Sequence, residues 1–299
     1  MEQNGLSRMF FDQLDTAQAL IGAPDAITHV MVASHDGDWT EFTVAATLDA
    51  LGFVKRDDKE PKLKVVTADE LIQTFEKFIY ARARSSDAQY RFKQDSFATL
   101  LAIGDQIQRQ ELEAKITHTV GEIVLTKTGL EEEIQYAKRF KDRRWQLPFY
   151  FDLLEEARIN LQEGLRHLVE SGYLAVNGDN IDLTSQGIEL LQIVLNRKLS
   201  IGVQSIFQYQ ERINIMSGLF IQTATELWYI DVDQEITCKT IDRQAFADII
   251  LKMVAPGEKF TIPMQEKEIV DKKPKFCAKC GQPLKPGVKF CRTCGRKIS

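Results

Sequence analysis

Apolar and polar positions alternate over several short stretches of this chain and follow a helical period over others. Alternation in residues 27–33 predicts a strand, and residues 227–232 and 235–241 predict the two strands of a hairpin. In residues 242–253 the apolar side chains lie three or four positions apart, which predicts a helix with Asp242 as its N-cap. Because strands and helices are interspersed, the pattern predicts an α+β fold.

Two parts of the chain share one succession of features. Each contains a predicted helix that ends at a glycine, Gly52 or Gly172, followed by a short strand that an aromatic residue opens. A polar turn, a strand and a helix capped by threonine come next, with Thr67 and Thr184 as the caps. This order indicates two diverged repeats of mixed helix and strand. The alternative is that the similarity between the two parts arose by chance, because this order of elements is common in proteins.

The repeats and the changes in composition predict four regions. Residues 1–140 and 141–256 are two α+β halves, which form either two domains or one. Residues 257–275 contain two prolines and a charged run, which predicts an extended linker. Residues 276–299 are predicted to form a zinc ribbon.

The zinc prediction rests on four of the five cysteines, which form two CxxC pairs separated by ten residues. The four predicted zinc ligands are Cys277, Cys280, Cys291 and Cys294. Each CxxC turn aims two thiolates at one point, so two turns complete a tetrahedral site without an open position for water. We therefore predict one structural zinc ion; disulfides, the alternative, are disfavoured under reducing conditions. The segment resembles the short zinc ribbons at the ends of many bacterial proteins, which accompany unrelated partner domains.

Charge is divided unequally along the chain. From Asp271 onward there are nine basic residues and one acidic residue, a net charge of +8, which leaves −13 for the part of the chain before Asp271. An acidic body repels nucleic acid and acidic membranes. The basic tail is able to contact nucleic acid, phosphates or an acidic protein face, or serves only to keep the ribbon in solution. The division predicts different partners for the two parts.

No familiar catalytic motif occurs. None of the four histidines has metal-ligand spacing, and phosphate-binding loops and nucleophile elbows are missing from the sequence. In His35-Asp-Gly-Asp38 a turn, with Asp38 capping a helix that begins near Trp39, is favoured over acid–base chemistry. Cys238, in a strand-like run, is interpreted as a half-buried structural cysteine and not as a nucleophile. The runs Glu131–Glu133 and Glu155–Glu156 are interpreted as solvated helix faces.

The cellular location is predicted from two kinds of segment that the sequence lacks. No stretch approaches 18 consecutive apolar residues, so no transmembrane helix is expected. Residues 1–7 carry neither a basic cluster nor an apolar run, so no signal peptide is expected either. We therefore expect a cytoplasmic protein.

Parts of the chain resemble winged-helix domains, in which a helix, a glycine and a β-wing ending in Leu-Thr-x-x-Gly recur. Leu183-Thr-Ser-Gln-Gly187 matches that ending, and Leu125-Thr-Lys-Thr-Gly129 matches its final part. The helical region that would enter a DNA groove contains more acidic than basic residues: Glu155, Glu156, Glu163 and Glu170 beside Arg158 and Arg166. Since phosphate contact needs a positive face, the resemblance implies a winged-helix shape used for protein contact.

The body also resembles the EspG-type chaperones of type VII secretion in size, mixed α/β build and pseudo-twofold halves. The similar pieces are residues 48–71 and residues 227–257, and no binding residue is carried over from the family. The favoured function is a non-catalytic adaptor or chaperone that binds a protein partner, with a connection to secretion implied by this resemblance. A nucleic-acid-associated regulator using winged-helix-like units and the basic ribbon is the alternative, and an enzyme with an unrecognised site the third. No small-molecule substrate is indicated.

Overall fold

The computed structural model describes residues 22, 24–47, 51–55, 63–79, 88–119, 121–140, 142–154, 159–209, 212–232 and 235–255. The predicted linker and zinc ribbon, residues 257–275 and 276–299, lie outside them. The chain divides into two compact units, Met1–Phe260 and Thr261–Ser299. All described residues belong to the first unit.

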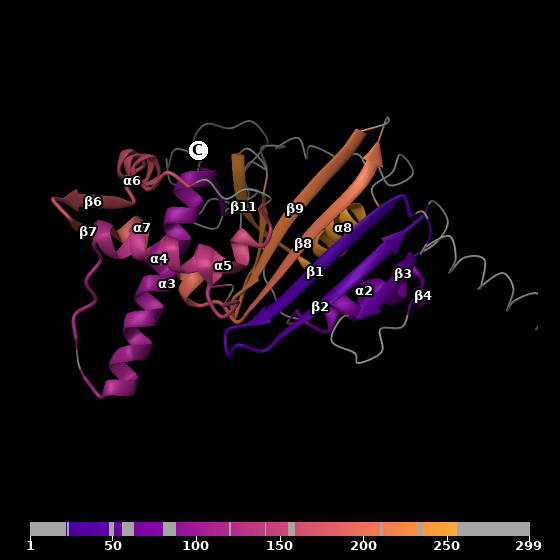
Figure 1. The fold of residues 1–299 in the computed structure, drawn as a ribbon, viewed down its shortest axis with the longest axis horizontal. Coiled ribbons are helices and arrows are strands. Elements are labelled where there is room, and N and C mark those ends of the chain that lie inside the picture. The colour runs from indigo at the N-terminus through magenta and orange to yellow at the C-terminus, as the bar shows by residue number, and fades with distance from the viewer. Residues whose placement is uncertain are drawn as a thin grey trace, which may run out of the picture. The chain divides into compact units, whose positions relative to one another are not determined.

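One antiparallel sheet organises the described residues (Figure 1). Nine of their strands join in the order β4-β3-β2-β1-β8-β9-β10-β11-β5. The strands are β1 (Ala26–Ser34), β2 (Trp39–Ala46), β3 (Leu51–Lys55), β4 (Lys64–Val66), β5 (Gln89–Lys93), β8 (Leu199–Tyr209), β9 (Arg212–Gln222), β10 (Leu227–Asp231) and β11 (Glu235–Ile241). Strands from before residue 94 and after residue 198 therefore share one sheet.

The sheet contains two similar sets of elements. Strands β1 to β4 form an antiparallel series that leads into helix α2 (Ala68–Glu76), and strands β8 to β11 form another that leads into α8 (Arg243–Val254). The first strands of the two sets, β1 and β8, pair with each other antiparallel, with Val30 opposite Val203. The α+β prediction is confirmed, and the two sets have the same order of strands and helix.

The structural sets differ from the two units matched in the sequence. Gly52 lies inside strand β3, opposite Ala45, and does not end a helix. Gly172, by contrast, follows helix α6 (Leu161–Glu170) with φ of 76°, as predicted. The predicted correspondence between these two glycines is therefore wrong.

The helix predicted to begin near Trp39 is also wrong. Trp39 opens strand β2, and residues 35–38 form the tight turn of the β1–β2 hairpin, in which Gly37 has φ of 96°. The turn was predicted correctly from Asp-Gly, but Asp38 caps no helix. The alternation of β-branched and aromatic residues after the turn favours a strand.

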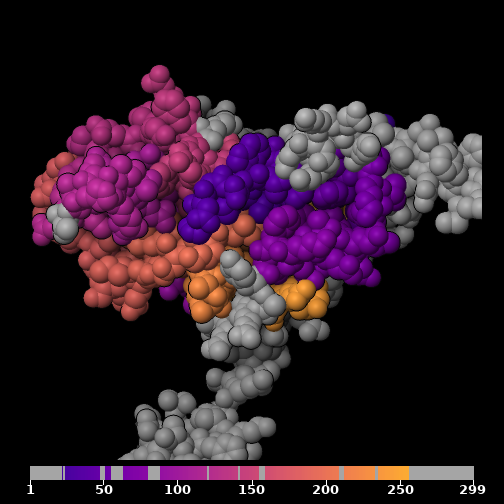
Figure 2. Space-filling view, turned by 90° about the horizontal axis from the view of Figure 1, so that it is seen from below, coloured from indigo at the N-terminus to yellow at the C-terminus, as the bar shows by residue number. Residues whose placement is uncertain are grey.

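One face of the sheet is covered by α2 and α8. Apolar side chains from both helices and from strands β1, β2, β8, β9, β10 and β11 form a buried cluster there, which includes Leu71, Phe75, Phe220, Phe246 and Ile250. The violet surface of α2 and the orange surface of α8 lie next to each other (Figure 2). Helix α8 contacts β1 and β2 of the first set as well as β8 of the second, so this core joins the two sets.

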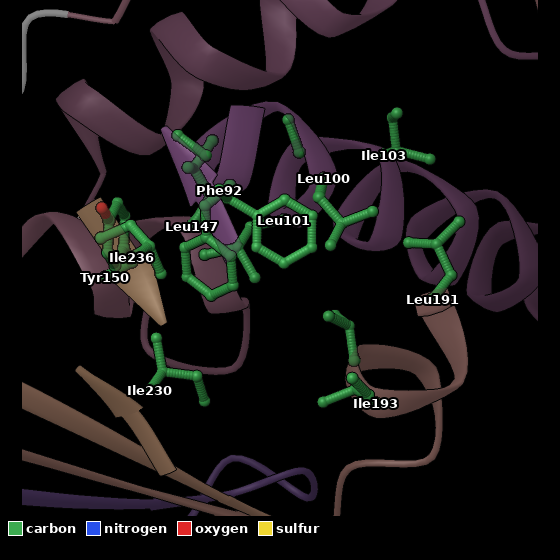
Figure 3. Close-up of a cluster of buried hydrophobic side chains, with 14 of the residues drawn as sticks. Phe92, Leu100, Leu101, Ile103, Leu147, Tyr150, Leu191, Ile193, Ile230 and Ile236 are labelled. Carbon is green, nitrogen blue, oxygen red and sulfur yellow. The ribbon is translucent and has the colours of Figure 1, made fainter. Parts of the chain in front are cut away.

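Five described helices and a hairpin lie on the other face. The elements are α3 (Gln94–Thr117), α4 (Lys127–Arg139), α5 (Gln146–Phe151), α6, α7 (Ser185–Leu195) and the hairpin β6 (Leu174–Asn177) and β7 (Asn180–Leu183). Side chains of α3, such as Leu101, meet Leu147 of α5, Leu191 of α7 and strand residues Ile230 and Ile236 (Figure 3). This second core covers strands β9, β10, β11 and β5, which are neighbours in the sheet, and one end of β1 and of β8.

Several helix caps agree with the sequence. Thr67 forms a capping box with Glu70 at the start of α2, and the side chains of Thr184 and Asp242 accept from the first-turn amides of α7 and α8. The strands β10 and β11 pair as predicted; the predicted turn residues between them, 233 and 234, lie outside the described residues. Caps and hairpins depend on neighbouring residues, which explains why they were predictable.

Candidate functional site

The four zinc-ligand cysteines lie outside the described residues, so their prediction rests on spacing. Among the residues that the structure describes, no group of three or more His, Cys, Asp or Glu side chains is arranged to hold a metal ion. The structure therefore offers no second metal centre within the described part of the body.

The histidines occupy separate places. His29 lies on β1 with Nε2 3.6 Å from a carboxylate oxygen of Glu41, and His35 lies in the β1–β2 turn 3.1 Å from Asp36. His118 is the left-handed C-cap of α3, with φ of 54°. His167, on α6, lies 2.9 Å from the ammonium of Lys93. The structure does not bring them together.

Cys238 is more deeply buried than predicted. Its side chain is 2% exposed and belongs to the core between the sheet and the helices. Burial raises the pKa of its thiol, so the reactive thiolate is disfavoured. This agrees with a structural role.

The helical region contains a β-hairpin that pairs with an extended segment. Helix α3 is followed by an extended segment, by helices α4, α5 and α6, and then by the β6–β7 hairpin, which stands where the sequence predicted a wing. The extended segment pairs with the wing through a bridge between Thr126 and Asn180, and the Ile181 amide donates to the Leu125 carbonyl at 2.9 Å. The segment from 183 to 187 ends the wing and starts α7, as the resemblance implied.

Close packing of α6 on α3 depends on a glycine. A Cβ at Gly164 would lie 2.1 Å from Thr99 Oγ1 and 2.5 Å from the Asp95 carbonyl oxygen. The Asp95 carboxylate also accepts from the Asn160 amide at 2.9 Å, and Asn160 caps α6. These contacts fix the helix that would be the recognition helix of a DNA-binding protein.

The exposed face of α6 is poorly suited to phosphate. Arg166 donates to Glu163 at 2.6 Å and to Glu170 at 2.7 Å, so two carboxylates surround one guanidinium. This guanidinium holds the pKa of Glu163 below its usual value. A phosphate would have to displace these carboxylates and overcome their repulsion. Glu155, Glu156 and Arg158 lie outside the described residues.

A shallow groove of about 350 Å³ runs beside α6. Leu161, Leu165, Val169 and Val176 supply its apolar lining. Lys127 and Glu131 of α4 border it together with Arg166 and Glu170 of α6. An apolar floor between polar edges is typical of a peptide-binding groove and not of a nucleic-acid site.

A larger apolar feature lies where the sheet extends beyond the helices α3–α7. Direct strand pairing places six small or apolar residues side by side across β4, β3, β2, β1, β8 and β9. They are Val65, Gly52, Ala45, Ile27, Ile206 and Ile215, which we call the apolar row. Ile27, Ile206 and Ile215 are 47%, 44% and 40% exposed and Val65 is 38% exposed, whereas Ala45 is half-buried and Gly52 is buried.

The apolar row differs from an ordinary strand surface. Neighbouring strands lie about 4.8 Å apart, so six positions span about 24 Å. Ile213 of β9, 77% exposed, extends the apolar surface by one further position. Single exposed apolar residues are common, whereas a contiguous patch marks an interaction surface. The row was not predicted from the sequence, because Ile27 and Ile206 lie in distant parts of the chain and only the pairing of their strands brings them together.

Charged groups border the surface on the side of the helices. Arg143 forms ion pairs with Glu41 of β2 and with Asp152, and its guanidinium lies 4.5 Å from the ring centroid of Trp39. His29 also faces Glu41. This paired cluster forms a polar boundary beside the apolar row, as at the rim of many protein interfaces.

Two buried acidic residues were not recognised in the sequence. Asp105 is fully buried and accepts from the backbone amides of Gln146 and Leu147 at 2.8 and 2.7 Å, at the start of α5. Burial raises its pKa to about 7. Glu133 was predicted to be solvated, but it is buried and receives two hydrogen bonds from Arg109, so that part of the prediction is wrong. Both carboxyl groups hold helices together.

Comparisons with known proteins give a family match for the tail of the chain. Residues 276–298 match the zinc-ribbon domain, a zinc-binding class of module. No curated protein matches the chain in sequence. A solved structure of the Mycobacterium tuberculosis type VII secretion system chaperone EspG5, in complex with a PE25-PPE41 dimer, is similar at 9% identity and a TM-score of 0.43. That similarity covers 86% of this chain and 87% of the matched chain, and at this level it carries no information about function. None of the described helices has the length and apolar character to span a membrane.

Proposed function

We propose that this chain is a non-catalytic, cytoplasmic adaptor or chaperone that binds another protein through the apolar row. The single observation that carries the proposal is the three exposed isoleucines that lie side by side on β1, β8 and β9, within an uncharged row across six paired strands. Burying apolar surface contributes about 25 cal/mol per Å², so such a row favours a partner with matching apolar side chains. The partner is therefore expected to present leucine, isoleucine or aromatic residues, not phosphate.

The zinc ribbon is proposed to be a second, separate contact. Cys277, Cys280, Cys291 and Cys294 would hold one zinc ion, with all four positions of a tetrahedral site filled by sulfur. Such an ion folds the ribbon and supplies no catalytic water. The +8 charge of the tail fits an acidic partner surface.

Selective loss of a partner tests the proposal. Tagged full-length chain is used to capture partners from its own host, with nuclease present, and the dissociation constant of each purified partner is then measured. Replacing Ile206 and Ile215 by glutamate is expected to weaken binding by at least tenfold, because charges would be buried without partners. Ile116→Glu is the matched control, since Ile116 is 69% exposed on α3, away from the row.

The outcomes separate the alternatives. Equal binding by the row variant and the control, with both folded by circular dichroism, would refute the row as the contact. Captured proteins that are lost on nuclease treatment would instead support the second candidate function, a nucleic-acid-associated regulator. The basic tail is the feature that favours this candidate.

A further inference from the structure

The apolar row lies beside the point where the N-terminal segment of the chain begins. The Asp25 amide donates to the Ala46 carbonyl of β2 at 2.8 Å, and the Asp25 carbonyl accepts from Gln208 of β8 at 3.3 Å. Asp25 is thus fixed between two strands of the row, two residues before Ile27. Asp25 therefore lies within about 7 Å of Ile27 at the usual rise per strand residue, and residues 1–21, which lie outside the described residues, end four residues before Asp25.

The sequence of this segment has one apolar face. Five of its apolar residues recur three or four positions apart, at Leu6, Phe10, Leu14, Ala17 and Ile21; Met9 and Leu20 adjoin this stripe in a helical projection, whereas Phe11 and Ala19 fall outside it. This spacing is typical of an amphipathic helix. Polar residues fall between these positions, at Arg8, Asp12 and Asp15 among others. The segment therefore carries the same kind of surface that the row leaves exposed.

The segment is also long enough. Sixteen helical residues measure about 24 Å. From β1 the row extends about 14 Å across three strands to Val65 and about 10 Å across two strands to Ile215. The segment therefore reaches either end of the row.

We propose that residues 6–21 cover the apolar row of the same chain and that a protein partner displaces them. This rests on the proposed function for the role of the row in partner binding, but the contact itself does not. A segment tethered this closely has an effective concentration in the millimolar range, so even a weak apolar contact is occupied. The covered row is protected from self-association, and the segment competes with the partner.

A photo-crosslinker placed at position 10 of the full-length chain tests the contact. In place of Phe10, which lies in the tryptic peptide of residues 9–55, benzoylphenylalanine is expected to form crosslinks within one chain to the tryptic peptides that contain Ile206 or Ile215. The same probe at position 8, on the opposite face, is the control and should give several-fold less of these products. Products that are confined to other peptides, or that form only between chains as concentration rises, would overturn the proposal.

Two variants connect the contact to partner binding. Ile206→Glu should abolish the crosslink from position 10, whereas Ile116→Glu should leave it unchanged. Phe10→Asp with Leu14→Asp should tighten partner binding several-fold by removing the competitor. If the crosslinks to the row form but the row variants bind the partner as tightly as wild type, the proposed function alone is refuted. Row-dependent partner binding without these crosslinks would refute the covering segment alone.

Discussion

Single residues show where local patterns stop being informative. Thr67, Thr184 and Asp242 were recognised because a cap and the amides it binds lie within three residues. Asp105 acts on amides 41 and 42 residues away, so no local motif marks it. The prediction for Glu133 failed for the same reason: its arginine, Arg109, is 24 residues distant. Long-range electrostatic pairs require the fold before they can be identified.

Asp105 gives stability a defined pH dependence. Its pKa is raised from 3.8 to about 7 in the folded state. Between these values the folded chain keeps a proton that the unfolded chain has lost. Stability therefore falls as pH rises from about 4 to about 7, by up to about 1.4 kcal/mol per pH unit, and levels off above pH 7. Asp105→Asn should remove this contribution.

Urea unfolding of wild type and Asp105→Asn at pH 5 and at pH 7.5 measures the effect. The free energy of unfolding of wild type should decrease, relative to that of the variant, between the two pH values. The exposed Asp182→Asn is the control for loss of one carboxylate. Parallel curves for wild type and Asp105→Asn would contradict the assigned role.

At the level of elements, the prediction succeeded for β1, β10, β11 and α8 and failed for β2. An Asp-Gly turn leads equally well into a helix or into the second strand of a hairpin, and the two cases differ only in the conformation of the residues after Asp38. The alternating stretch from Trp39 to Ala46 favours the strand, whereas the cap interpretation placed a helix there. Pairing with β1 on one side and β3 on the other decides the conformation, and such pairing is not visible in the local sequence.

The contact between α3 and α6 provides a prediction at this scale. Gly164→Ala should destabilise the protein by about 1–3 kcal/mol, because the added methyl group overlaps Thr99 and the backbone of Asp95. Gly121→Ala is the control, since nothing lies within 4 Å of a Cβ at that position. Chemical unfolding of both variants measures the difference. Equal free energies of unfolding for the two variants would show that α3 and α6 can move apart without a loss of stability.

At the scale of the whole molecule, the sequence predicted the fold class but not the arrangement of strands. Two similar sets were expected, yet the matched glycines lie in different kinds of element, one inside β3 and one after α6. The true similarity joins β1–β4–α2 to β8–β11–α8, and it resides in topology. The apolar row and the sheet order depend on pairing between strands from the two ends of the body, so periodicity alone does not reveal them.

Zinc provides a test at the same scale. The purified, reduced chain should contain about one zinc ion, as the four-thiolate ribbon requires. Cys280→Ser should lower that content strongly, whereas Cys238→Ser should not, since Cys238 is buried in the body. Elemental analysis measures both. Zinc well below one equivalent in the wild type would contradict the prediction.

The position of β5 has a consequence for synthesis of the chain. This strand is made early but pairs with β11, which is made only after the whole helical region, just as β1 waits for β8. While the ribosome is still translating the helical region, β1 and β5 each have an edge that lacks its final neighbour. Unpaired edges are the usual starting points of aggregation. The nascent chain should therefore be most vulnerable before residue 241 emerges, and its folding should be slow for its size because so many contacts are distant in sequence.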